Sequence, residues 1–153
     1  VNFNMGAAYI NLMEERTLYA VNKDETIKDY LDGIKTSFDA CIKLQQDISG
    51  EKSLKVADKY IKIAEVIFYS FDSIYSVLDN SHAKEYFSYF ENYLLKSFEI
   101  KSEILGIDSK ETKDICYELY QYYLANSINM MMFEDLIQDK KKALYYGELY
   151  IGE

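Results

Sequence analysis

Proline is absent from the 153 residues of this chain, whereas average usage would supply about seven or eight. Because proline breaks helices and orders loops, its absence favours long helices joined by short connections. Chains of this kind usually present surfaces for binding, since catalytic residues tend to lie on longer loops held by a scaffold. The composition therefore favours an all-α binding module, and no enzyme activity is predicted.

Histidine and arginine each occur once, as His82 and Arg16. With a single histidine, a Ser-His-Asp triad or a histidine-rich metal site would need unusual substitutes, and we expect a structural or neutral role for His82. With a single arginine, capture of phosphopeptides by guanidinium groups is disfavoured. Acidic pairs such as Glu14 and Glu15 are adjacent and point to different sides of a helix, which does not suit a paired-carboxylate mechanism. The sequence predicts no catalytic residue, no metal ligand and no cofactor.

The net charge of −9 argues against a broad surface for phosphate backbones, so no nucleic-acid partner is expected. Lysines gather locally at Lys140, Lys141 and Lys142, where a solvated helix face is the favoured interpretation and peripheral membrane association is the alternative. No apolar run is long enough to span a bilayer, and no signal-peptide pattern is present. Cys41 and Cys116 lie in apolar stripes without a nearby partner cysteine, which is typical of reduced thiols in a cytoplasmic protein.

Apolar residues recur at steps of three and four in six segments of the chain, the pattern of helices with one buried face. Short polar joints make consecutive helices antiparallel neighbours, and the resulting hairpins of roughly 50 residues share too little sequence for a regular repeat array. A small bundle and an α-solenoid are both compatible with this pattern. We favour a tetratricopeptide-like solenoid of stacked antiparallel hairpins, all-α and forming one domain over residues 1–153. The predicted helices cover about 1–20, 25–48, 54–78, 82–105, 109–129 and 134–151.

Capping residues mark several of the predicted helix ends. Asp24 and the pair Asn80–Ser81 are predicted N-caps, and Asp108, with an acidic residue three positions later, resembles a capping box. Gly50 and Gly106 each follow a helical segment, which is typical of a C-terminal stop.

The third predicted helix carries apolar residues on two faces, so we expect it to lie centrally and to touch neighbours on both sides. Its extra apolar residues suit a partner groove for an amphipathic helix, and packing against residues outside this chain is the open alternative. Met130–Met132 suit an adaptable binding surface or, more simply, gap filling at a helix end. The main stripe comprises Leu54, Ala57, Ile61, Ala64, Phe68, Phe71, Tyr75 and Leu78, and the second face comprises Val66, Ile67, Ile74 and Val77.

Three segments carry a family resemblance: FNMGAAY at 3–9, IAEVIFY at 63–69 and YGELYI at 146–151. They are similar to the segments "FN-x-[GA]-A-x-[YL]", "AQEVFF" and "[FY]GEEIARL" of one helical family, and they occur in the same order at similar spacing. The chain therefore resembles the Bro-type domain, the helical module of ALIX-like and rhophilin-like endosomal adaptors.

The resemblance implies the central part of a larger Bro-type domain, with a core of tetratricopeptide-type hairpins. Val1, which stands in place of Met within a helical pattern, agrees with a piece of a longer protein. The resemblance also implies a non-enzymatic, endosome-associated scaffold that binds the C-terminal helix of an ESCRT-III subunit. The family's patch for this partner lies on the helix that matches residues 64–79, so Ile67, Phe71 and Ile74 are the predicted partner-binding residues. The later positions of that patch fall on polar residues here.

A second resemblance covers residues 90–153. The stretch from Ser97 to Asp108 is similar to the helix-end pattern of kinesin-light-chain tetratricopeptide repeats. It implies a generic tetratricopeptide-like adaptor that holds a peptide in a concave groove, and it explains residues 90–153 well but residues 1–60 poorly.

Overall fold

The computed structural model describes residues 2–74, 76–128 and 136–152, and these ranges contain helices and no strand. The predicted all-α class is therefore confirmed. Within the described ranges, no helix combines the length and apolar character that crossing a bilayer requires. The helices are α1 (Asn2–Leu18), α2 (Lys23–Ser49), α3 (Leu54–Tyr69), α4 (Phe71–Ile74), α5 (Asn80–Leu105), α6 (Lys110–Ile128) and α7 (Leu136–Ile151).

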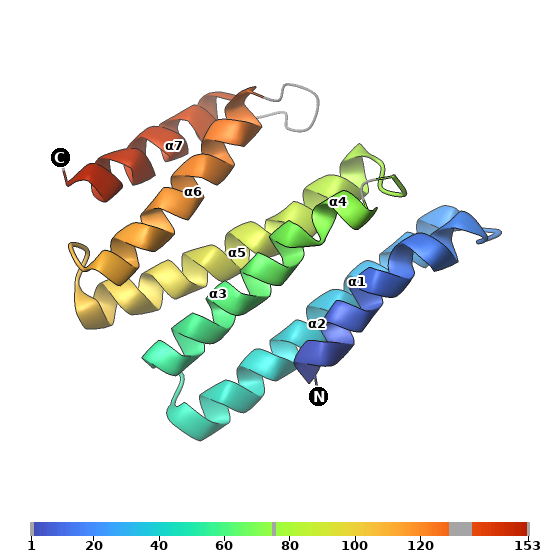
Figure 1. Cartoon of the computed structure of the whole chain (residues 1–153), viewed down its shortest axis with the longest axis horizontal. Coiled ribbons are helices and arrows are strands. Elements are labelled where there is room, and N and C mark those ends of the chain that lie inside the picture. Colours follow the sequence, from blue (N-terminus) through green and yellow to red (C-terminus); the bar gives the residue numbers. More distant parts are fainter. Residues whose placement is uncertain (1, 75, 129–135, 153) are drawn as a thin grey trace.

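The long helices pack as three consecutive antiparallel hairpins (Figure 1). The first hairpin pairs α1 with α2, the second pairs α3 with α5, and the third pairs α6 with α7. The first and second hairpins meet through α2 and α3, and the second and third meet through α5 and α6. The predicted stack of hairpins is confirmed, and its central member is α5, which packs on α2, α3 and α6.

Polar side chains begin the helices close to the predicted positions. The predicted caps Asp24 and Asn80–Ser81 lie inside the first turns of α2 and α5, and Asp108 lies just before the residue that caps α6. Neighbouring polar residues have similar capping ability, so only the backbone conformation decides which one is used. The residues that accept a hydrogen bond from the backbone N–H three positions later are Asn22 (3.3 Å), Asp79 (2.9 Å) and Ser109 (3.2 Å).

Glycine ends α2 and α5, as predicted. Gly50 has a φ of 87° and Gly106 a φ of 85°, a region that side chains with a Cβ rarely adopt. Each glycine N–H donates to the carbonyl four residues earlier, which satisfies one of the carbonyls left free at a helix end.

The third predicted helix is shorter than expected, and the face that it buries differs from the predicted stripe. It ends at Tyr69 rather than near residue 78, and Ser70 separates it from the single turn α4. The hydroxyl of Tyr86 on α5 donates to the carbonyl oxygen of Ile67 at 2.9 Å, which gives a partner to a carbonyl near the helix end. The buried residues of α3 are Val56, Ala57, Ile63, Ala64 and Ile67, whereas Leu54 and Phe68 of the predicted stripe are exposed.

Polar bonds join α5 to α2 of the first hairpin and to α3 of its own hairpin, within a core rich in aromatic rings. The Tyr93 hydroxyl donates to Asp39 on α2 at 2.8 Å, and the Ser97 hydroxyl donates to the Ala57 carbonyl on α3 at 3.0 Å. Because a buried hydroxyl must find a partner, these bonds fix the position of α5 along α2 and α3.

Candidate partner-binding groove

The structure places the three predicted partner-binding residues in or near the core. Ile67 is fully buried and Ile74 is 1% exposed, so neither side chain offers a surface to a partner in this conformation. Phe71 is partly buried, with its ring centroid 4.3 Å from that of Phe87 on α5. The Phe71 ring and the Ile67 carbonyl attach the α3–α4 turn to α5. The single turn α4, which carries Ile74, packs on α1 and α3.

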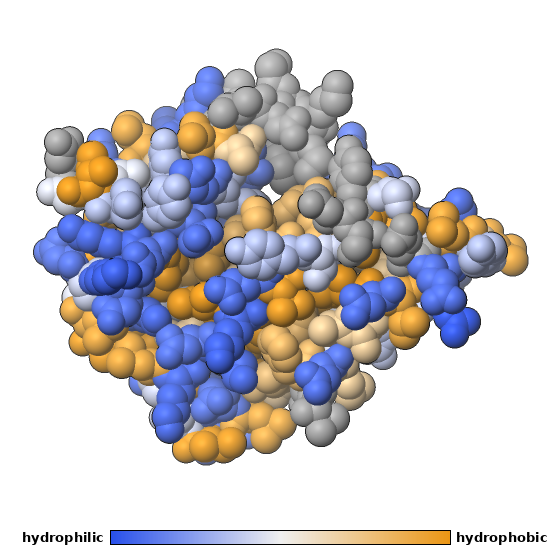
Figure 2. Space-filling view, in the orientation of Figure 1, coloured by the Kyte–Doolittle hydropathy of each residue, from blue (hydrophilic) through white to orange (hydrophobic). Residues whose placement is uncertain are grey.

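The apolar side chains that do reach the surface nearby are Phe68 and Tyr69, which are 49% and 77% exposed. Phe68 is held in place by its neighbours, since its ring centroid lies 5.4 Å from that of Phe90 and 5.6 Å from that of Tyr69. In the view of Figure 2, apolar side chains reach the surface across the middle of the molecule and polar side chains border them. The sequence pattern placed Phe68 in a buried stripe and therefore missed this surface.

Phe68 and Tyr69 line a groove that we call the α3–α6 groove. The helices α3 and α6 both pack on α5, and the groove lies over α5 between them. Its cavity of about 60 Å³ is far smaller than the roughly 300–1,000 Å³ of small-molecule sites, so it suits one inserted side chain rather than a cofactor. It is lined by Ile61, Ala64, Glu65, Phe68 and Tyr69 from α3, Phe90 and Leu94 from α5, and Glu118 from α6.

Two carboxylates and no basic residue belong to this lining. Glu65 is contributed by α3 and Glu118 by α6, so the negative charges come from both sides of the groove. Burial raises the pKa of the Glu118 carboxyl, and the negative charges of Glu65 and Asp114 raise it further. The groove therefore combines an apolar surface with a local excess of negative charge.

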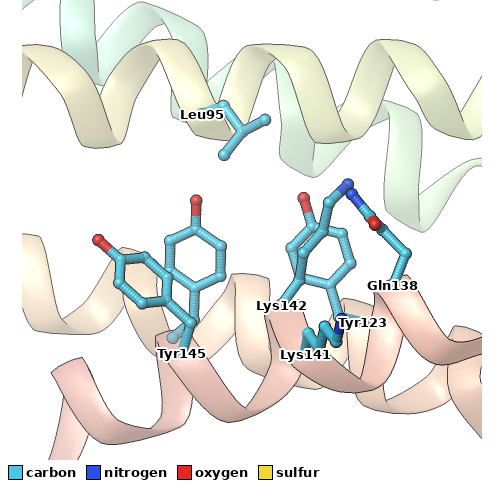
Figure 3. Close-up of a pocket in the computed structure, with 7 residues that line it drawn as sticks. Leu95, Tyr123, Gln138, Lys141, Lys142 and Tyr145 are labelled. Carbon is cyan, nitrogen blue, oxygen red and sulfur yellow. The ribbon is translucent and has the colours of Figure 1, made fainter.

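A second cavity, of about 280 Å³, lies between α5 and the third hairpin. In Figure 3, Leu95 faces it from α5, and Tyr123 and Tyr145 face it from the side of α6 and α7. The Lys142 ammonium lies 2.9 Å from Glu91 Oε1 and 4.7 Å from the centroid of the Tyr123 ring. Because Lys142 is held by these contacts, its charge serves to attach α7 to α5.

The predicted lysine cluster is therefore divided. Lys142 turns toward Glu91, while Lys140 and Lys141 are exposed on α7. A surface of two lysines is a weaker attraction for an anionic membrane than a surface of three, since each adds about 1 kcal/mol. Met130–Met132, which were predicted as an adaptable surface or gap filler, lie outside the described residues.

One group of side chains has the composition of a cation site. The ligand atoms of Asp24, Asp79 and His82 lie within 4.8 Å of one another, and carboxylate oxygens and imidazole nitrogens are common metal ligands. The His82 imidazole lies 3.0 Å from Asp79 and 3.3 Å from Asp24. Asp79 also caps α5, and the hydrogen bond from the His82 backbone N–H lowers the pKa of its carboxyl. These contacts connect the first turn of α2 with that of α5, in line with the structural role expected for His82.

In comparisons with family models, curated proteins and solved structures, nothing matches this chain.

Proposed function

We propose that this chain is a non-enzymatic protein-interaction module whose α3–α6 groove binds an amphipathic helix of a partner protein. The observation that carries the proposal is the pair Phe68 and Tyr69, two large apolar side chains that are exposed side by side at the groove. Exposed aromatic residues backed by packed neighbours are the usual anchors of protein interfaces. Helices that lie in grooves use apolar anchor residues three, four and seven positions apart, and the α3–α6 groove is large enough for one such anchor.

The resemblance to Bro-type domains supports a particular occupant, the C-terminal helix of an ESCRT-III subunit. On this proposal the module acts in endosomal sorting, and the partner contacts Phe68 and Tyr69. Ile67 and Ile74 then belong to the core and not to the contact surface, because both are buried.

A generic tetratricopeptide-like adaptor that binds an extended peptide is the second candidate. It is favoured by the arrangement of the groove, whose walls come from α3 and α6, the first helices of two successive hairpins. The two candidates differ in the conformation of the bound segment, which is helical in the first and extended in the second.

The proposal is tested by titrating the protein into a fluorescently labelled peptide of an ESCRT-III C-terminal helix. We expect saturable binding that Phe68→Ser weakens by at least about tenfold, as for truncation of an interface anchor. Tyr145→Ser is the matched control, because Tyr145 is 51% exposed and lines the second cavity. Circular dichroism and thermal melting check that both variants fold.

Binding that survives Phe68→Ser, or that Tyr145→Ser weakens equally, contradicts the proposed groove. No saturable binding of the ESCRT-III peptide excludes that occupant. Circular dichroism of the complex separates the two candidates, because only a bound helix adds helical signal.

A further inference from the structure

We infer that the partner helix carries a lysine or arginine that lies between Glu65 and Glu118 of the α3–α6 groove, beside an apolar anchor seated on Phe68 and Tyr69. This inference rests on the proposed function and adds the chemistry that selects the partner. The two carboxylates line the same small cavity as the aromatic pair. An occupant of the groove therefore meets both kinds of side chain at once.

The first argument is the lack of a counter-charge. Asp114, one turn before Glu118 on α6, pairs with Lys110 at 2.7 Å, but no described residue forms an ion pair with Glu65 or Glu118. Like charges that share a site oppose each other's ionisation, and the raised pKa of Glu118 agrees with that opposition. A cationic side chain of the partner would reduce the repulsion between the two carboxylates.

The second argument is the cost of excluding water. An apolar partner residue placed on Phe68 displaces water from the neighbouring carboxylates, and an ionised carboxylate that loses water without gaining a partner is strongly destabilised. An uncharged or acidic occupant therefore leaves this cost without compensation. A basic side chain compensates it through charge-assisted hydrogen bonds.

The third argument is spacing. Glu65, Phe68 and Tyr69 are at positions i, i+3 and i+4 of α3, so they share one face of the helix within about one turn, or 5.4 Å. A partner helix running along this face meets the aromatic pair and the Glu65 carboxylate about one turn apart. Its basic residue is accordingly three or four positions from its apolar anchor.

The test uses three synthetic peptides of about 18 residues, long enough to form a helix on binding. All three share one leucine stripe, and the positions flanking the stripe carry lysine, glutamine or glutamate. Binding is measured by fluorescence anisotropy at low and at high salt. The protein variants are Glu65→Gln with Glu118→Gln, Phe68→Ser, and the control Glu148→Gln, which changes an exposed glutamate of α7.

We expect the lysine peptide to bind about tenfold more tightly than the glutamine peptide at low salt, and the glutamate peptide to bind most weakly. High salt should reduce the difference. The double glutamine variant should lose the preference for lysine while it still binds the glutamine peptide. The Glu148→Gln control should retain the preference, which excludes a general effect of the net charge of −9.

Equal binding of the lysine and glutamine peptides, or a preference for lysine that persists in the double glutamine variant, overturns the inference and leaves the proposed function standing. If no peptide binds, or if Phe68→Ser weakens none of them, the proposed function fails and the inference fails with it.

Discussion

The ring of Phe38 on α2 lies directly against Gly6 on α1, so closely that a Cβ atom at position 6 would come 2.5 Å from Phe38 Cε1. A second contact of this kind has the glycine on α2 and the ring on α1. A Cβ atom at Gly33 on α2 would come 2.8 Å from Tyr9 Cε1 on α1. Each helix thus contributes one glycine and one aromatic ring. The missing side chains let the first hairpin close.

Replacing Gly6 with alanine should lower the free energy of unfolding by about 1–2 kcal/mol, because overpacking outweighs the gain in helix propensity. Urea denaturation measures the change. Gly147→Ala on α7 is the control, since its Cβ atom would lie 3.2 Å from the edge of the Tyr120 ring, and its cost should be smaller. A Gly6→Ala protein as stable as the Gly147→Ala protein would show that the first hairpin tolerates a wider separation.

The Tyr86→Phe substitution should cost about 1–2 kcal/mol of stability, because it removes the donor to the Ile67 carbonyl inside the core. Tyr89→Phe should cost less, since the Tyr89 hydroxyl bonds to Glu85 on its own helix near the surface. Chemical denaturation compares the two variants. Equal effects would argue that the hydroxyl of Tyr86 does not support the end of α3.

Glu118→Gln should stabilise the folded protein at pH 7. The pKa of Glu118 is raised in the folded state above its ordinary value of 4.5, so its ionisation favours the unfolded state as the pH rises through this range. The stabilisation should therefore be present above the folded pKa, absent below the unfolded pKa, and smaller in high salt. Thermal melts of both proteins between about pH 3 and pH 8, where carboxyl groups titrate, measure the effect. Glu148→Gln, which changes an exposed glutamate of α7, is the control.

The two cysteines should react at very different rates with a thiol reagent at about pH 8, just below the ordinary thiol pKa. Cys116 is fully buried, and burial raises the pKa of its thiol to about 11, whereas Cys41 is only partly buried. One thiol should be titrated in the native protein and the second only after unfolding. A Cys41→Ser variant should remove the first reaction, and prompt modification of that variant would show that α6 opens readily.

Much of the fold follows from short-range signals. Gly50 and Gly106 predict the ends of α2 and α5 because a glycine stop depends on the local backbone. The end of α3 could not be predicted in this way, because the partner of its Ile67 carbonyl is Tyr86, nineteen residues further along the chain. Long-range contacts of this kind leave no periodic pattern in the sequence.

The sequence predicts a partner groove on the third helix, but it does not predict the residues that line the α3–α6 groove. Two apolar stripes compete on α3, and spacing alone does not say which of them faces α5. The structure buries Ile67 of the second face together with Ala57 and Ala64 of the main stripe, and it leaves Phe68 half exposed. Glu118 could not be connected with Glu65 from the sequence either, because their proximity depends on α3 and α6 sharing α5 as a support.

The α3–α6 groove spans the joint between the second and third hairpins, and α6 meets the rest of the molecule at α5. Because the two walls belong to different hairpins, the width of the groove depends on how the third hairpin packs on α5, and the Lys142–Glu91 ion pair contributes to this packing. An occupant that contacts both walls would favour the docked position of the third hairpin. Binding of the occupant and docking of the third hairpin would then be thermodynamically coupled. A mutation that loosens the packing of α7 would therefore weaken binding without contacting the ligand.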